Sequence, residues 1–154
     1  MTVLDEYTRQ GLAIECQRHL TSGDIIQVLQ RLVARHGPPQ CLKSDNGPEF
    51  IAKAVQQWLA ETGIQTRYIE PGSPWQNGHP ESFHAVLRDS CLNRWLFLTL
   101  REAQEVIAAW LAEYNTERPH GALNDLAPAR FAARYAASKA WNTESNNATT
   151  TVHP

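Results

Sequence analysis

The chain has 154 residues, of which 42% are hydrophobic, and its formal net charge is −2. This length suits one globular domain that buries its own core. No stretch reaches the roughly eighteen consecutive apolar residues of a membrane span, and the first residues lack the basic and apolar segments of a secretory signal. Because phosphate binding depends on Lys and Arg, the acidic balance predicts that this chain alone binds nucleic acid weakly.

The three cysteines, Cys16, Cys41 and Cys91, are odd in number and widely spaced. No two of them form the Cys-x-x-Cys pattern of a zinc knuckle. We therefore interpret them as reduced, largely buried thiols of a cytoplasmic protein, because structural disulfides are rare in that compartment.

In the first part of the chain, strand-like and helix-like patterns alternate. Residues 2–4 are short and apolar, residues 5–11 are typical of a polar hairpin turn, and residues 12–16 read as a strand. A helix follows, because Thr21-Ser22 can cap it and the apolar residues after them recur at a helical period. Gly37-Pro38-Pro39 ends this helix.

The middle of the chain continues the alternation. Residues 40–44 form a short apolar run that ends at Asp45, and residues 49–62 have the apolar spacing of a second helix. Residues 65–69 are typical of another strand, and residues 71–78 form a long irregular loop rich in Gly and Pro.

The last part of the chain is mostly helical. Pro80 suits the first turn of a third helix, and the capping box Thr99-Leu100-Arg101-Glu102 opens a fourth. A last short helix begins near Pro128. We expect one domain over residues 1–135 and a disordered, low-complexity tail over residues 136–154. Strands that alternate with helices predict an α/β layered fold.

Two carboxylates stand at places where such a fold can present them together. Asp45 lies at the end of a short strand and Glu81 at the start of a helix, with 35 residues between them. Hard cations such as Mg²⁺ favour oxygen ligands. Two such ions, roughly 3.5–4 Å apart, clamp the attacking and leaving oxygens of a phosphoryl transfer. The pair therefore indicates a polynucleotidyl transferase, although each residue alone also fits a solvated turn or a favourable first-turn position.

Several runs of residues resemble motifs of bacterial insertion-sequence transposases in the retroviral-integrase superfamily. Residues 44–50, Ser-Asp-Asn-Gly-Pro-Glu-Phe, resemble the second acidic motif of the family, and residues 76–83, Gln-Asn-Gly-His-Pro-Glu-Ser-Phe, resemble the third. The interval of 35 residues between Asp45 and Glu81 matches the family's D-D-35-E signature. Residues 87–93 resemble the continuation of the glutamate helix, residues 114–123 the C-terminal block, and residues 127–131 the closing helix.

The resemblance implies a ribonuclease H-like fold, in which helices flank a mixed sheet. It also implies Mg²⁺- or Mn²⁺-dependent cutting and joining of transposon ends at a two-ion site. Carried over by position, Asp45 and Glu81 are two of three metal-holding carboxylates. The partners implied are DNA, as transposon ends and target, and a second copy or an intact transposase. No membrane is involved, and the implied location is the bacterial cytoplasm, with the nucleoid.

The sequence departs from the family pattern at its beginning. Residues 3–9 resemble the segment after the first strand of the family's sheet, and Asp5 matches an aspartate that is not a metal ligand. We therefore expect the first strand and the first catalytic carboxylate to be absent, so that metal binding and strand transfer by this chain are weak. We also expect an exposed sheet edge and poor solubility.

Other residues near the acidic motifs have two interpretations each. Arg88 lies two helical turns after Glu81, so it is either a phosphate contact or a solvated arginine. Gln76 and Asn77 precede Glu81, and we favour DNA contact for both over a solvated loop. We interpret His79 and His84 as surface histidines, because two-metal phosphoryl transfer favours oxygen ligands.

The remaining aromatic and basic residues are less informative. We expect three tryptophans to be core residues rather than base-stacking platforms: Trp58, Trp95 and Trp110. Arg118-Pro119-His120 fits either a DNA contact or a helix-ending turn. The leading hypothesis is an integrase-core fragment of an insertion-sequence transposase. The alternative is a non-catalytic remnant that acts as a DNA-binding or oligomerising module.

Overall fold

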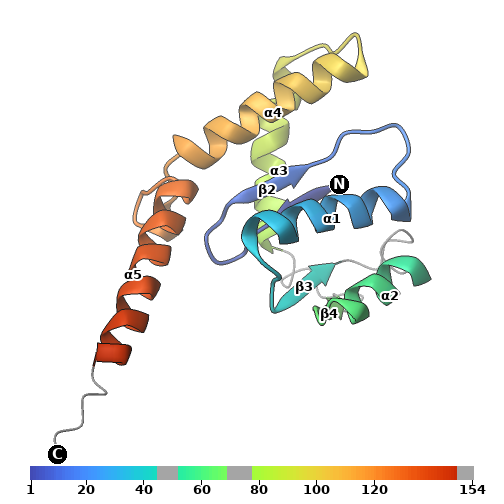
Figure 1. Cartoon of the computed structure of the whole chain (residues 1–154). Coiled ribbons are helices and arrows are strands. Elements are labelled where there is room, and N and C mark those ends of the chain that lie inside the picture. Colours follow the sequence, from blue (N-terminus) through green and yellow to red (C-terminus); the bar gives the residue numbers. More distant parts are fainter. Residues whose placement is uncertain (45–51, 69–77, 149–154) are drawn as a thin grey trace, which may run out of the picture. The chain divides into compact units, whose positions relative to one another are not determined.

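The computed structural model describes the backbone of residues 1–44, 52–68 and 78–148 (Figure 1). These residues form a mixed α/β chain that divides into two compact units. The first unit comprises Met1 and residues 15–104, and the second comprises residues 2–14 and 105–154. The fourth helix, α4 (Leu100–Thr116), begins in the first unit and continues in the second.

The first unit opens with helix α1 (Ser22–His36), which begins and ends as the sequence predicts. The Thr21 hydroxyl accepts a hydrogen bond from the backbone N–H of Asp24 at 3.3 Å. The Asp24 carboxylate accepts one from the backbone N–H of Thr21 at 2.8 Å, which completes a capping box. Hydrogen bonds from Thr21 hold the pKa of Asp24 below its usual value. The helix ends at Gly37, whose φ of 82° few other residues adopt.

Helix α2 (Lys53–Glu61) is shorter at its start than the apolar pattern predicts. Residues 49–51 lie outside the described residues, and Ala52 has a ψ of 130°, which is not helical. The reason is that apolar spacing marks a buried face, whereas a helix start needs a cap, and Ala52 offers no side-chain hydrogen bond. Gly63 follows the helix with a φ of 72°, which is typical of a glycine just past a helix end.

The core of the first unit lies between α1 and α2. Ile25 and Leu29 of α1 pack with Val55 and Leu59 of α2, and with Ile64, and all five are buried. Burying such side chains contributes roughly 1.5–3 kcal/mol each. The partly buried residues around this cluster come from both helices, from strand β3 (Cys41–Ser44) and from the adjoining segments: Met1, Leu20, Ile26, Val33, Leu42, Ala52 and Trp58. Trp58 is therefore part of the core region, as predicted.

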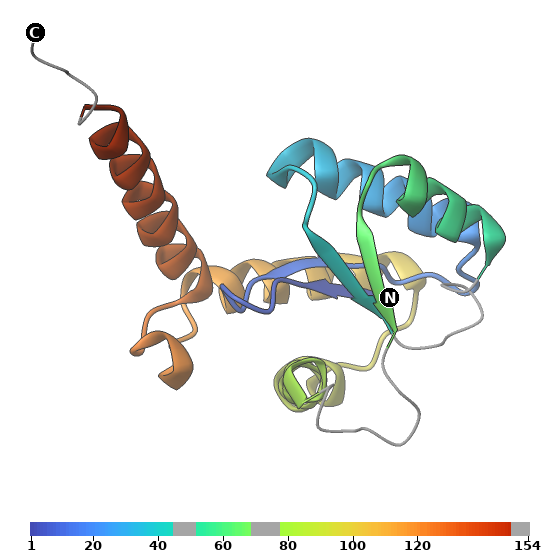
Figure 2. The same cartoon turned by 90° about the horizontal axis from the view of Figure 1, so that it is seen from below.

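Strands β3 (Cys41–Ser44) and β4 (Gln65–Tyr68) run side by side and parallel (Figure 2). Their register pairs Cys41 with Gln65 and Ser44 with Tyr68. The second unit holds an antiparallel pair, β1 (Thr2–Leu4) and β2 (Gly11–Ile14). Within the described ranges these are two separate two-stranded sheets rather than the one mixed sheet that the sequence predicts. Strands of three or four residues offer few ladder hydrogen bonds, so local pattern alone does not define their neighbours.

Helix α3 (Gly78–Ser90) and the short 3₁₀ helix η2 (Leu92–Arg94) follow. The predicted apolar face of α3 is buried at Phe83 and Leu87, and Cys91 beyond it is buried as well. The prediction for Trp95 was wrong, because this side chain is 56% exposed. It follows η2 in extended backbone, where helical spacing no longer directs a side chain inward. Cys16 and Cys41 are half-buried, and all three cysteines are free thiols.

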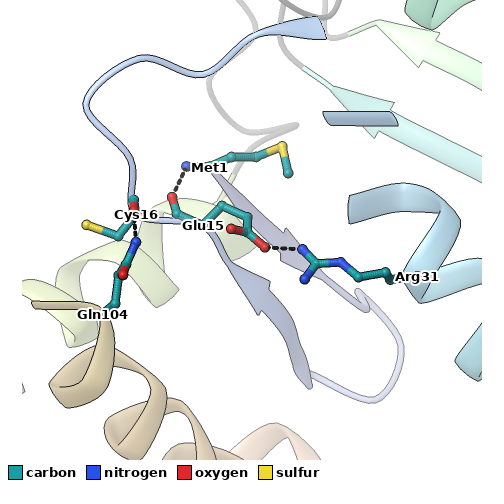
Figure 3. A network of polar contacts seen from close by, with 5 residues as sticks. All are labelled: Met1, Glu15, Cys16, Arg31 and Gln104. Atoms are coloured by element: carbon teal, nitrogen blue, oxygen red, sulfur yellow. Dashed lines mark hydrogen bonds and ion pairs between the residues drawn. The ribbon is translucent and has the colours of Figure 1, made fainter. Parts of the chain in front are cut away.

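A small polar network ties the segment after β2 to the rest of the first unit (Figure 3). The N-terminal ammonium of Met1 donates to the backbone carbonyl of Glu15 at 2.9 Å. The Glu15 carboxylate forms an ion pair with Arg31 of α1. The Gln104 side chain, in the first turns of α4, donates to the carbonyl of Cys16 at 2.8 Å.

The second unit contains the β1–β2 hairpin, most of α4, the 3₁₀ helix η3 (Gly121–Leu123) and helix α5 (Pro128–Ala148). Tyr7 at the hairpin turn packs against two rings of α5, with ring centroids 5.8 Å from Phe131 and 4.7 Å from Tyr135. The sequence predicts only a short helix here, but α5 continues to Ala148, since its alanines are strong helix formers. The expected domain boundary near residue 135 stays a prediction.

Candidate metal centre and nucleic-acid interface

The carboxyl ends of β3 and β4 meet at one edge of their sheet, because the strands are parallel and Ser44 pairs with Tyr68. Asp45 follows Ser44 in the sequence and lies outside the described residues. The carboxyl edge of a parallel sheet is where α/β proteins commonly bind ligands. Ser44 is buried, and its hydroxyl oxygen has no hydrogen-bond partner among the described residues. A buried hydroxyl group normally has a hydrogen-bond partner.

Glu81 lies in the first turn of α3 and is exposed. An acidic side chain there is favoured by the positive end of the helix dipole. Arg88 lies seven residues later in the same helix and is also exposed, as the helical period predicts. Both side chains are therefore accessible to a ligand.

His84 lies between these two residues on α3. The side chain is exposed as a whole, but desolvation where it meets the protein lowers its pKa, and the positive charges of the N-terminal ammonium and of Arg88 lower it further. The histidine therefore favours its neutral form near neutral pH. The expectation that His79 and His84 are surface residues holds for His84, which is exposed, and only partly for His79, which is half-buried.

Three of the predicted site residues, Asp45, Gln76 and Asn77, lie outside the described residues. The distance between the Asp45 and Glu81 carboxylates therefore stays a prediction. Within residues 1–44, 52–68 and 78–148, no three His, Cys, Asp or Glu side chains gather in a way that could hold a metal ion. In the same residues, no helix is both long and apolar enough to cross a membrane.

Asp5 has a structural position in the hairpin turn. One of its carboxylate oxygens accepts hydrogen bonds from the backbone N–H groups of Tyr7 at 2.9 Å and Thr8 at 3.3 Å. Its own backbone N–H donates to Gln10 at 2.9 Å. This geometry is an Asx turn, and that Asp5 is not a metal ligand stays a prediction.

The block over residues 114–123 contains contacts that the sequence did not predict. The Asn115 side chain accepts a hydrogen bond from the N–H of Gly11 at 2.9 Å and donates one to the carbonyl of Gly11 at 2.8 Å. This side chain thereby fixes the hairpin to the end of α4. Tyr114 is buried and lies against the rings of Trp110 and His120. The sequence pattern that could have predicted these contacts is a polar Asn next to a Tyr at the end of an apolar helix.

Two family models that describe an integrase core domain match the chain, one over residues 1–74 and the other over residues 62–128. A protein of the insertion element IS407 from Burkholderia multivorans is 40% identical over 138 residues, which are 90% of this chain and 50% of that protein. The transposase of insertion sequence element IS904 from Lactococcus lactis is 30% identical over 95 residues, which are 61% of this chain and 38% of that protein. This chain spans half the length of the curated relatives, or less.

Solved structures also match. The catalytic core domain of BIV integrase has a TM-score of 0.68 at 19% identity, over 90% of this chain and 87% of that chain. The HTLV-2 integrase catalytic core domain in complex with magnesium, in a dimeric form, has a TM-score of 0.58 at 21% identity, over 76% of this chain and 74% of that chain. The fold is thus that of a ribonuclease H-like integrase catalytic core. The chain belongs to the integrase core domain family, and it is homologous to transposase proteins of insertion elements and to retroviral integrase cores.

Proposed function

We propose that this chain carries part of a divalent-metal centre that cuts and joins DNA during transposition, with Asp45 and Glu81 as metal-holding carboxylates. The observation that supports this most is the pair of acidic motifs, 35 residues apart, in a chain of the integrase core family. The magnesium complex of the HTLV-2 core supports Mg²⁺ as the ion. Mn²⁺ is the second candidate, because it too is suited to carboxylate ligands.

The donor set fits such an ion. Asp45 follows the carboxyl end of β3, and Glu81 is an exposed carboxylate on the first turn of α3. A bound pair of ions would activate the attacking oxygen and stabilise the leaving oxygen. The chain's own residues would hold the ions and position the DNA. Arg88 would bind a backbone phosphate, and Gln76 and Asn77 would contact the DNA beside it.

The activity of this 154-residue chain alone is proposed to be weak. The family resemblance implies three carboxylates, and the matched motifs supply two, Asp45 and Glu81. With two ligands the affinity for metal falls, and strand transfer falls with it. The proposed partners are transposon ends, target DNA and a second copy or an intact transposase. The proposed location is the bacterial cytoplasm, with the nucleoid, which agrees with bacterial insertion-element relatives.

The same shortage of carboxylates favours a second candidate function. A chain that holds metal weakly would act as a non-catalytic module, which binds DNA or pairs with an intact transposase. The two functions differ in whether strand transfer depends on the carboxylates.

The test of the metal centre is paramagnetic broadening by Mn²⁺ in NMR spectra of the whole chain. We expect the amide signals of Ser44 and of the first turn of α3 to broaden. We expect D45N or E81Q to weaken Mn²⁺ binding by roughly tenfold or more, because loss even of outer-shell partners commonly costs about that much. The control is E113Q, which neutralises an exposed glutamate of α4 and should leave the broadening unchanged.

Absence of broadening at high Mn²⁺, or broadening that survives both D45N and E81Q, would show that these carboxylates do not hold the ion. A strand-transfer assay of the same proteins decides between the two functions. Activity that requires Asp45 would contradict the proposed weakness of the chain, and inactivity with retained DNA binding would favour the non-catalytic module.

A further inference from the structure

Two arginines of the second unit lie within electrostatic reach of the same pair of rings. Arg9 belongs to the hairpin turn, and Arg118 follows the end of α4. The rings of Tyr114 and His120 meet edge to face, with centroids 5.0 Å apart. Burial lowers the pKa of His120, and the charges of Arg118 and Arg9 lower it further. Burial raises the pKa of Tyr114, and the same two charges oppose that shift. The positive charges of both arginines therefore act on the same pair of rings.

The backbone around these arginines is held in place. Arg9 has a φ of 63°, in the left-handed region, and its N–H donates to the carbonyl of Asp5 at 2.9 Å. Two residues further on, Gly11 is held by both hydrogen bonds of the Asn115 side chain. Arg118 follows Asn115 by three residues. Arg9 and Arg118 therefore each lie within three residues of the contact between the hairpin and α4.

The positive charge at this place has no acidic partner in the part of the chain that the structure describes. The ion pair between Arg31 and Glu15 lies in the first unit and involves neither Arg9 nor Arg118. The carboxylate of Asp5, close in sequence to Arg9, is already bonded to backbone N–H groups. The Nε2 atom of His120 is also buried without a hydrogen-bond partner among the described residues. Two like charges that flank one backbone contact favour an anion between them, because the anion relieves their repulsion.

We propose that Arg9 and Arg118 bind a phosphate group of the DNA backbone, at a subsite built from residues of the second unit. Guanidinium groups suit this ligand, because they donate paired hydrogen bonds to phosphate oxygens. The subsite rests on the proposed function only in taking DNA as the source of the phosphate. It would position DNA without reading its sequence.

The test measures binding of the whole chain to a short DNA duplex over a series of salt concentrations. Each phosphate contact contributes about 0.9 to the slope of log affinity against log salt. We therefore expect R9Q and R118Q each to weaken binding and to reduce the magnitude of that slope by about 0.9. The double variant R9K with R118K keeps both charges and should retain most of the wild-type slope. The matched control is R35Q, which removes an exposed arginine of α1 in the first unit and should keep the wild-type slope.

Thermal melts show whether the variants fold. If the Gln variants do not fold, the Lys variants, which keep the charge, are compared with the wild type instead. A second arm adds inorganic phosphate and follows the Arg Nε signals by NMR. Shifts with phosphate and no slope change with DNA would assign the subsite to a free anion instead of the nucleic acid. Absence of DNA binding at low salt, or an equal loss in R35Q, would overturn the proposal. The Mn²⁺ experiment uses other residues, so either result stands without the other.

Discussion

His84 and His120 each have a pKa below the ordinary value of 6.5, and in both the first cause is partial burial. Nearby positive charges lower the pKa further. For His84 they are the N-terminal ammonium and Arg88, and for His120 they are Arg118 and Arg9. Between the lowered values and pH 6.5, the unfolded chain therefore binds more protons than the folded chain. The stability that depends on neutral histidine is complete above pH 6.5 and is lost as the pH falls below it.

We accordingly expect the melting temperature to decrease when the pH is lowered from about 7 to about 5. H84Q and H120Q should each make this decrease smaller, because glutamine does not titrate. H19Q, which replaces an exposed histidine, is the control and should retain the wild-type decrease. Circular-dichroism melts at several pH values measure the effect. A decrease of the same size in H84Q, H120Q and H19Q would exclude the two partly buried histidines as its source.

At the scale of single residues, the sequence predicts a position well where local geometry defines it. The Thr21 cap depends on one helix, and it forms as expected. Trp95 is different, because its environment depends on which distant segment covers it. The pairing of Asn115 with Gly11 also could not be predicted, since it joins residues that are 104 positions apart in sequence.

At the scale of elements, the order of helices and strands follows the sequence closely. Turn and cap residues place the hairpin, α1 and the end of α2, because Gly, Pro and Thr act through local dihedral angles and hydrogen bonds. The start of α2 and the length of α5 differ from the sequence-based prediction, because the first lacks a strong capping residue and the second lacks a strong stop signal. The hairpin itself depends on one side chain of α4.

Substitution of Asn115 tests that dependence. N115A removes both hydrogen bonds to Gly11, which is buried, and leaves its backbone N–H and carbonyl groups unpaired. We expect it to destabilise the protein by roughly 1–3 kcal/mol, the cost of unsatisfied buried groups. N115D keeps the acceptor but loses the donor, so it should also destabilise. Denaturant unfolding measures the free energy, and hydrogen exchange of the Gly11 amide should accelerate.

The neighbouring T116A is the control for Asn115. Thr116 is exposed, and its hydroxyl donates only to the carbonyl of Ala112 in its own helix at 2.9 Å. We expect T116A to change the free energy of unfolding by no more than about 0.5 kcal/mol, as for most surface substitutions. Slow exchange of the Gly11 amide in N115A, equal to that in T116A, would mean that the hairpin does not need the Asn115 side chain.

At the scale of the whole molecule, the α/β class was predicted from alternating strand and helix patterns, and the family from motifs. The mixed sheet that the resemblance implies is, in the described ranges, two separate pairs of strands. In the described ranges, each of the four strands has one hydrogen-bonded neighbour, and the two pairs belong to different units. Motifs carry over from relatives position by position, and the TM-scores support the fold they imply. Pairing of short strands is set by contacts far apart in sequence, which no local pattern records.

Strand edges and exposed apolar side chains among the described residues make self-association the expected behaviour of this chain. Strand edges offer unpaired N–H and carbonyl groups to other copies. Three large apolar side chains between η2 and α4 are 56%, 85% and 82% exposed: Trp95, Leu96 and Leu98. We expect the 154-residue chain to elute in size-exclusion chromatography as broad, concentration-dependent species larger than a monomer.

L96K with L98K should shift this elution toward the monomer, because two charges make the exposed segment unfavourable to bury. The control is A108K with A109K, which adds the same charge at exposed positions of α4 and should change the elution less. If both pairs act equally, net charge rather than the apolar segment governs association. A sharp monomer peak of the unmodified chain at high concentration, with a cooperative melt, would show that neither the strand edges nor this segment causes association.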